Sequence, residues 1–296
     1  MLLLFYGNIV NSAKSWFNLG FFSFQPSEFA KTILIIYMGV YFSELNKKSH
    51  GKNAFLIPLA IAILIFLLVA MQPDLGTATI IACIVFLTFL SIPMKENALA
   101  KTLKLIAGVV AIVAIVFLAS GLSFLNDMQK SRLQFVRPCT RYTEETGYQV
   151  CNGFIAINNG GLFGVGIGKS TQKYLYLPEA HTDFIFPIAI EELGLVFGII
   201  TIIGYIYILF RLMKISKECY NLRNSIIVYG IMCYIFTHIV INFCGILALM
   251  PLTGVPVPFL SYGGSYTWNL IFAMFVVERI VIENKVTKKN IEIANI

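Results

Sequence analysis

Charge is scarce in this sequence. Only 12% of its 296 residues are charged and 58% are hydrophobic, whereas soluble domains carry roughly 25% charged residues. With so little polar surface the chain cannot be a water-soluble enzyme, and its composition indicates a polytopic membrane protein. The net charge of +7 comes from basic residues scattered over short loops, so a nucleic-acid partner is excluded as well.

Patterns typical of metal sites and of secreted precursors are also missing. The six cysteines contain no C-x-x-C pair, which argues against a zinc or redox centre. Residues 1–10 lack the basic start and the cleavage site of a signal peptide. Most cysteines lie in or beside apolar runs and are interpreted as small hydrophobic residues. Cys139 and Cys151 share a polar loop instead, where a disulfide can form if the loop is extracytoplasmic.

The sequence does contain seven apolar runs, each long enough to cross the roughly 30 Å of hydrocarbon in a bilayer. We therefore expect one all-α membrane domain over residues 1–296, a polytopic protein with about seven transmembrane helices and a long ordered extracytoplasmic loop. The runs cover residues 27–45, 54–72, 75–93, 102–120, 186–210, 225–248 and 263–283.

Basic residues give these spans an orientation. The Lys and Arg residues of the short connections after spans one, three, five and seven fall on one side, which the positive-inside rule assigns to the cytoplasm. The long 121–185 loop then lies outside, and its apolar, glycine-rich segments predict order and not disorder. Its basic residues predict either an anionic ligand such as a lipid phosphate or a solvated positive face: Lys130, Arg132, Arg137, Arg141, Lys169 and Lys173.

Acidic residues are concentrated in the stretch PEAHTDFIFPIAIEELG, residues 178–194. Asp183 should lie at the outer interface. One interpretation is that Thr182 caps a helix and Asp183 stabilises its positive end. The other is that Asp183 is a general base, with Glu179 and His181 as neighbours that tune it.

Glu191 and Glu192 follow within the same stretch. On a continuous helix they would lie roughly 12–14 Å deeper than Asp183, where ionisable groups are unfavourable unless they are paired or face a wet cavity. Both alternatives stay open here: one glutamate pairs with a cation or a helix end, or the two line a cavity.

Four further motifs carry local expectations. In SFQPSEFAK (23–31), Glu28 and Lys31 are spaced for an ion pair at the outer end of the first span. Asp74 in QPDLG should cap the third span. NNGGLFGVGIGKS (158–170) lacks the spacing of a P-loop and predicts close backbone packing or a re-entrant turn. PLTGVPVPFLSYGGS (251–265) should be a shaped outer loop, and His238 a hydrogen-bonded core residue.

Several segments together resemble the SEDS family (shape, elongation, division and sporulation), which includes FtsW, RodA and SpoVE. They are NSAKSWFNLGFFSFQPSEFAK, QPDLGTA, GGLFGVGIGKSTQKYLYLPEAHTDFIFPIAIEELG and TGVPVPFLSYGGS, in the family's order and spacing. Members typically have ten spans, so the resemblance implies an N-terminally truncated chain that begins near the end of the family's second span.

The resemblance implies a peptidoglycan glycosyltransferase that polymerises lipid II at the outer face of the bacterial cytoplasmic membrane, for cell division or cell shape. It also implies a class B penicillin-binding protein as the transpeptidase partner, together with other divisome or elongasome proteins. Matched motif by motif, Asp183 is the family's essential aspartate, Glu28 and Lys31 line its central cavity, and Trp16 is the tryptophan before them.

The chemistry of lipid II fits a single carboxylate. Its diphosphate leaving group needs charge neutralisation and no proton, unlike the leaving groups of ordinary glycoside hydrolysis. We expect Asp183 to deprotonate the acceptor 4-hydroxyl, which attacks with inversion. A divalent cation such as Mg²⁺ or Mn²⁺ could assist. Candidates to bind the substrate are Lys31, Arg132, Arg137, Lys169 and Lys173, with His181 beside Asp183.

Two other functions stay open at this point. A lipid II flippase or transporter needs a polar path across the bilayer, which Glu191 and Glu192 would favour. A non-catalytic scaffold would only recruit a penicillin-binding protein.

Overall fold

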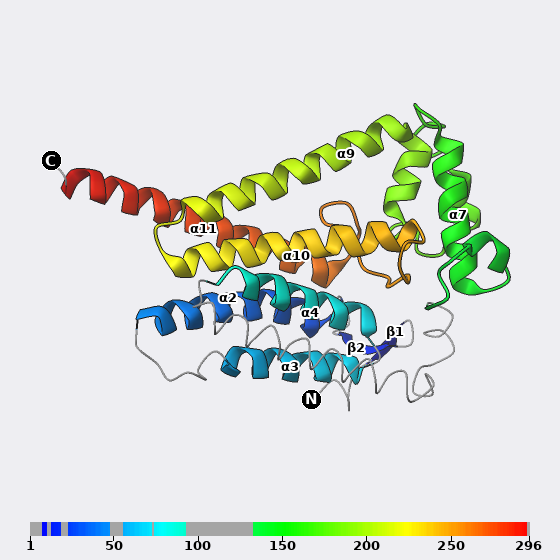
Figure 1. The fold of residues 1–296 in the computed structure, drawn as a ribbon. Helices are drawn as coiled ribbons and strands as arrows, with labels where there is room; N and C mark the ends of the chain where they lie inside the picture. Colours follow the sequence, from blue (N-terminus) through cyan, green and yellow to red (C-terminus); the bar gives the residue numbers. More distant parts are fainter. Residues whose placement is uncertain are drawn as a thin grey trace.

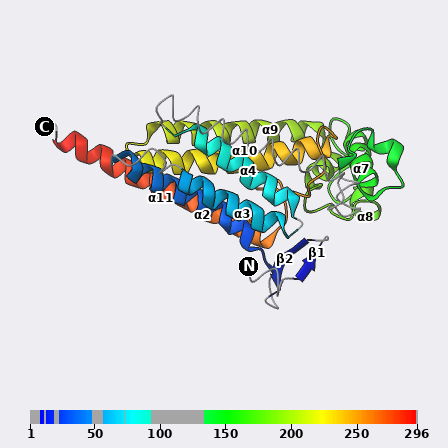
Figure 2. The same ribbon diagram turned by 60° about the horizontal axis from the view of Figure 1, so that its bottom comes forward.

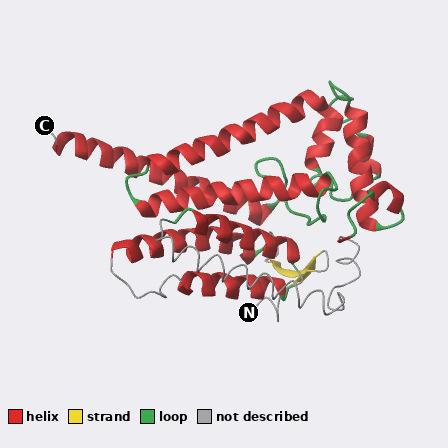
Figure 3. Cartoon of the chain, in the orientation of Figure 1, coloured by secondary structure: helices red, strands yellow, loops and turns green. Residues whose placement is uncertain are grey.

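The computed structural model describes residues 8–10, 13–18, 23–47, 56–72, 74–92 and 133–294. Helices dominate these residues, and strands are confined to one small sheet (Figure 3). The α-helices are α2 (Pro26–Lys47), α3 (Leu56–Ala70), α4 (Leu75–Leu90), α7 (Glu145–Gly160), α8 (Thr171–Leu175), α9 (Ile185–Glu218), α10 (Leu222–Ile246) and α11 (Gly264–Ala294), with a short 3-10 helix η1 (Pro138–Arg141).

The long helices run alongside one another as a bundle (Figure 1). α7 and α8 lie at one end of this bundle (Figure 2), and the C-terminal ends of α9 and α11 lie at the other. Figure 2 shows α2 beside α11, with the small sheet close to the α7 end. Asp183, just before α9, and the basic residues towards the C-terminal ends of α9 and α11 therefore lie at opposite ends of the bundle, as the alternation of basic loops predicted.

The predicted spans are confirmed in part. Within the described residues, α9, α10 and α11 are long and apolar enough to cross a membrane, whereas α3 and α4 are shorter apolar helices. α2 coincides with the expected first span but contains Glu28, Lys31 and Glu44. The expected span 102–120 lies outside the described residues.

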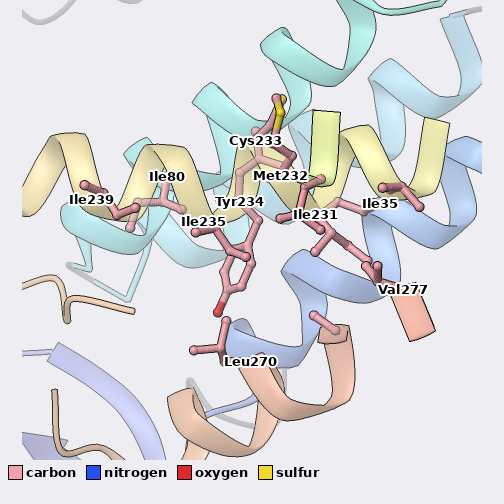
Figure 4. Close-up of a cluster of buried hydrophobic side chains, with 14 of the residues drawn as sticks. Ile35, Ile80, Ile231, Met232, Cys233, Tyr234, Ile235, Ile239, Leu270 and Val277 are labelled. Carbon is pink, nitrogen blue, oxygen red and sulfur yellow. The ribbon is translucent and has the colours of Figure 1, made fainter. Parts of the chain in front are cut away.

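The core of the bundle is built around α10. Ile231, Tyr234 and Ile235 on this helix are fully buried and pack against Ile35 of α2 and Val277 of α11. Figure 4 shows Tyr234 directed with its phenol oxygen towards α11. Gly230 lets α10 approach α2 closely, because a Cβ there would press against the side chain of Ile35. This close approach brings polar residues of α2 and α10 together further along the helices.

The predicted span 186–210 falls on α9, which is long and apolar enough to cross a membrane but is broken at Gly194 (φ 88°, ψ 170°). The part before the break packs with α7 at the end of the bundle, and the part after it runs along the bundle (Figure 1). Gly160 and Gly164 cause this close packing, since a Cβ at either position would overlap the backbone of residues 190–193. The glycine-rich segment therefore packs backbone against backbone, as predicted.

Residues 138–194 together form a compact unit that we call the cap. A disulfide joins Cys139, within η1, to Cys151 of α7, with the two Cα atoms 4.9 Å apart. The backbone N–H of Val165 donates to Glu191 O, and that of Leu195 donates to Gly161 O, so the glycine-rich turn holds the break in α9. The described part of the long loop is thus ordered, as expected, and residues 121–132 lie outside the described part.

A small antiparallel sheet was not predicted, and in this respect the all-α expectation is incomplete. The strands β1 (Asn8–Val10), β2 (Ala13–Asn18) and β3 (Ser23–Phe24) pair in the order β1-β2-β3. β3 leads directly into α2, so the sheet brings Trp16 to the end of the bundle where Glu28 lies.

Candidate active site

A cavity of about 400 Å³ opens at the cap end of the bundle. Its walls come from β2, the first turns of α2 and α4, α7, the segment before α9, α10 and the 251–263 loop. Asp183, Glu28, Lys31 and Trp16 all line it. Four residues that the sequence placed at one side of the membrane therefore share one cavity.

Lys31 and Glu28 form the buried polar floor of this cavity. The Lys31 ammonium donates to Glu28 Oε1 at 2.8 Å, which confirms the predicted ion pair. Lys31 is only 1% exposed, and its Nζ also lies 3.2 Å from His238 Nε2. Glu28 Oε2 is buried without a hydrogen-bond partner among the described residues. A buried charged oxygen in that state favours a ligand that donates a hydrogen bond.

Asp183 lines the cavity from the turn that precedes α9. The helix begins at Ile185 and its N-cap residue is Phe184, with no side-chain cap. Thr182 therefore does not cap α9, and this part of the capping interpretation is wrong. The Thr182 hydroxyl donates to Glu179 Oε2 at 2.7 Å, and Asp183 Oδ1 lies 3.1 Å from the same hydroxyl. Asp183 is 5% exposed, so its carboxylate is buried but lines a cavity.

The 251–263 loop holds the Asp183 segment in place. The Asn242 amide of α10 donates to Asp183 O at 2.9 Å and to Val255 O at 2.7 Å. The Ser261 hydroxyl donates to Thr182 O at 2.6 Å. Gly254 adopts φ 68°, and a Cβ there would lie 3.8 Å from Asp183 Oδ2. The loop is shaped as the sequence predicted, and a glycine leaves room beside the carboxylate.

Asp74 and Gln25 close another side of the cavity. Asp74 caps α4 by accepting from the Thr77 backbone N–H at 3.1 Å, as predicted, and it also accepts from Gln25 Nε2 at 3.0 Å. The Gln25 backbone N–H donates to the Ser265 hydroxyl, which in turn donates to Ser23 O. These bonds fasten the start of α2 to the start of α11.

The cavity is acidic. Lys31 is the one Lys or Arg side chain among its described lining residues, which also include five carboxylates: Glu28, Asp74, Glu145, Glu179 and Asp183. In the part of the chain that the structure describes, no group of three or more His, Cys, Asp or Glu side chains is arranged to hold a metal ion. An anionic ligand entering here would need added positive charge.

Comparison with known proteins identifies the family to which this chain belongs. The family model for FtsW, RodA and SpoVE, described as "Cell cycle protein", matches residues 1–286. The chain belongs to this SEDS family. It is 35% identical to the probable peptidoglycan glycosyltransferase FtsW of Bacillus subtilis (strain 168), over 94% of this chain and 69% of that protein. It is 34% identical to the stage V sporulation protein E of the same organism, over 91% of this chain and 72% of that protein.

Two solved structures have a fold similar to that of this SEDS chain. A chain of a peptidoglycan synthase complex, described for its structural coordination of polymerization and crosslinking, matches with a TM-score of 0.68 and 26% identity, over 93% of this chain and 75% of that chain. The crystal structure of the rod shape determining protein RodA of Thermus thermophilus matches with a TM-score of 0.57 and 25% identity, over 93% and 71% of the two chains.

Four other predicted site residues of this SEDS protein are described by the structure but are not among the residues that line the cavity. Arg137 is exposed and is the N-cap residue of η1, and Lys169 and His181 are also exposed. The Lys173 ammonium lies 3.6 Å from Glu192 Oε1 and 5.5 Å from the ring centroid of Tyr174. The His181 ring lies 6.0 Å from the ring of Tyr262, which does line the cavity. Arg132 lies outside the described residues, and the substrate-binding roles of these five residues stay predictions.

Glu191 and Glu192 are paired within the cap and lie outside the described lining of the cavity. Glu191 is 1% exposed. It accepts from the Ser170 hydroxyl, from Asn159 Nδ2 at 3.2 Å, from the Thr171 hydroxyl at 3.1 Å and from the Gln172 backbone N–H at 3.4 Å. The pairing alternative is therefore confirmed: Glu191 holds the start of α8, and Glu192 pairs with Lys173.

Two polar residues of α10 were not predicted as part of the site. His238 was expected as a hydrogen-bonded core residue, which its contacts confirm, and Asn242 was not considered, yet both contact the polar elements of the cavity. They are four residues apart, so they face the same side of the helix. Two polar side chains at this spacing in an apolar run are the signal that could have identified them.

Proposed function

We propose that this protein polymerises lipid II into glycan strands at the outer face of the bacterial cytoplasmic membrane. Its membership of the SEDS family and its relatives, named as probable peptidoglycan glycosyltransferases, support this activity. The observation that carries the proposal is the shared cavity, in which a buried carboxylate, Asp183, and a buried ammonium, Lys31, line one space.

The proposed reaction is an inverting displacement. Asp183 takes the proton from the 4-hydroxyl of the acceptor sugar as that oxygen attacks the anomeric carbon of the donor. The new glycosidic bond forms while the bond from the anomeric carbon to the diphosphate breaks, and undecaprenyl diphosphate leaves with the bonding electron pair. Burial of Asp183 excludes most water from the proton transfer and strengthens its electrostatic interactions.

Positive charge is needed where the diphosphate departs. Lys31 supplies one charge, held by Glu28 in the same cavity. The surplus of carboxylates around it favours a divalent cation that enters with the diphosphate, because Mg²⁺ is usually bound by one or two carboxylates together with substrate phosphates. Glu145 and Glu179 are the candidates to hold it, and its contribution would be to neutralise the charge of the leaving group.

We also propose a class B penicillin-binding protein as the partner that crosslinks the strands, with further divisome or elongasome proteins around the pair. The related peptidoglycan synthase complex, described as coordinating polymerization and crosslinking, supports this assignment. The relatives include a sporulation protein as well as division proteins, so the cellular role is best assigned by genetic complementation.

The test is reconstitution into vesicles that contain labelled lipid II. The proposal predicts glycan strands that lengthen with time and are shortened by a muramidase. Transfer of lipid II between leaflets without strands would instead indicate a flippase. Strands that form only when a polymerase-competent partner is added would indicate a scaffold. Either result would contradict the proposal.

A further inference from the structure

His238 is fully buried, yet both of its ring nitrogens have polar neighbours. Its Nε2 lies 3.2 Å from Lys31 Nζ, and its Nδ1 lies 3.2 Å from Pro256 O. The residue thereby joins three separate elements: α10, which carries it, α2, which carries Lys31, and the 251–263 loop. It also lines the cavity itself. Both nitrogens of a buried imidazole need polar partners, and one of the two partners here is the Lys31 ammonium that lines the cavity.

The two neighbours settle which nitrogen carries the proton. Pro256 O can only accept a hydrogen bond, so Nδ1 must be the donor. Nε2 is then the acceptor of a neutral imidazole, and the Lys31 ammonium is its donor. The ammonium has three N–H groups, of which one donates to Glu28 and one to His238. Two fixed bonds determine the direction of the third N–H.

Aromatic packing keeps the imidazole in this orientation. The Tyr266 ring stacks on it with centroids 4.8 Å apart and planes at 29°, and the Tyr234 ring meets it edge-on at 4.8 Å. Rotation of the imidazole would break both polar contacts at once. One turn further along α10, Asn242 holds the Asp183 segment and Val255. The same face of one helix therefore holds both the backbone that carries the Asp183 carboxylate and the Lys31 ammonium.

We propose that His238 is the positioning residue for Lys31. Its neutral imidazole accepts a hydrogen bond from the ammonium and directs the remaining N–H of Lys31 to the diphosphate oxygens of the substrate. The catalytic part of this statement rests on the proposed function, whereas the hydrogen bond and the tautomer do not. Loss of His238 leaves Lys31 charged but free to turn towards Glu28 alone.

Steady-state kinetics of lipid II polymerisation test the positioning role. His238→Leu removes the acceptor, and we expect kcat to fall about 10- to 100-fold with KM within about threefold. His238→Gln can keep both hydrogen bonds and should recover most of the rate. Lys31→Met combined with His238→Leu should be no slower than Lys31→Met alone. Losses that multiply, or a His238→Gln variant as slow as His238→Leu, would overturn the proposal. Ile235→Val, in the apolar core of the same helix, is the matched control.

Nitrogen NMR of protein with labelled histidine tests the hydrogen bond without any activity. The chain has three histidines, and the His238→Gln spectrum assigns the signal of His238. The proposal predicts a neutral ring protonated at Nδ1, with an Nε2 shift that moves when Lys31 is changed to Met. A ring protonated at Nε2 would refute it. A protein that shows the predicted spectrum but makes no glycan would refute the proposed function and leave the hydrogen bond standing.

Discussion

Asp183 and Glu191 lie in the same acidic stretch and are both buried, at 5% and 1% exposure, but their surroundings differ. Asp183 lines the cavity that also holds Lys31. Glu191 accepts four hydrogen bonds from residues 159–172 and organises the cap. Burial alone therefore does not distinguish a reactive carboxylate from a structural one. What distinguishes the two is whether the carboxylate faces a cavity.

The largest effect should come from Asp183→Asn. The amide keeps the shape of the side chain but cannot take a proton, so polymerisation should fall about 10²- to 10⁴-fold. The thermal unfolding midpoint should stay near that of the wild type, because the Asp183 backbone still accepts from Asn242. A strand-length assay on gels and a thermal melt, both in detergent, give the two values. Near-normal polymerisation would contradict the assignment of Asp183 as the reactive carboxylate.

Removal of the disulfide should have the next largest effect. The bond spans 12 residues of sequence, and closing a loop of this size is worth about 3 kcal/mol. The paired change Cys139→Ser and Cys151→Ser should therefore loosen α7, which hydrogen exchange of the cap would reveal. Because Glu145 and Gln149 of α7 line the cavity, the rate should also fall. Unchanged exchange in α7 would show that the cap does not depend on this bond.

Glu191→Gln tests the structural role of Glu191 in the cap. One of the two oxygens becomes an N–H group that faces donors, so we expect about 2 kcal/mol of lost stability in the cap. Limited proteolysis in the 161–172 segment should accelerate. The rate per folded molecule should change far less than in Asp183→Asn, and an equal loss of turnover without faster proteolysis would contradict the structural role.

The smallest effect should come from Lys173→Met. The Lys173 side chain is 41% exposed and its distance to Glu192 Oε1 is 3.6 Å, and pairs of this kind contribute about 0–1 kcal/mol. Stability should hardly change. A large loss of lipid II binding in this variant would restore the predicted role of Lys173 at the diphosphate and enlarge the site beyond the described cavity.

Much of the bundle could be predicted because apolar runs of sufficient length mark helices directly. α2, α10 and α11 begin and end within a few residues of the predicted runs, except for the extended end of α11. The alternation of basic loops also placed Asp183 and Lys31 at one end. These features depend on the composition of each local segment, which can be read directly from the sequence.

Contacts between distant segments could not be predicted. The break at Gly194 depends on the glycines at 160 and 164, which allow backbone contact across some thirty residues. The partners of Glu191 come from residues 159–172, and those of His238 from α2 and the 251–263 loop. No residue spacing indicates such pairs. The strands β1 and β3 are too short to show an alternation of apolar and polar residues, and the six residues of β2, AKSWFN, do not alternate strictly.

The central claim, that lipid II reacts in this cavity, is tested most directly by photo-crosslinking. Tyr262 lines the cavity and is 74% exposed, and Tyr174 on α8 is similarly exposed at 66% but is not among the described lining residues. A benzophenone amino acid replaces each in turn, and labelled lipid II is added in nanodiscs. We predict a crosslink at position 262 that unlabelled lipid II competes away, and little at position 174. A competed crosslink at position 174 with none at 262 would contradict the account.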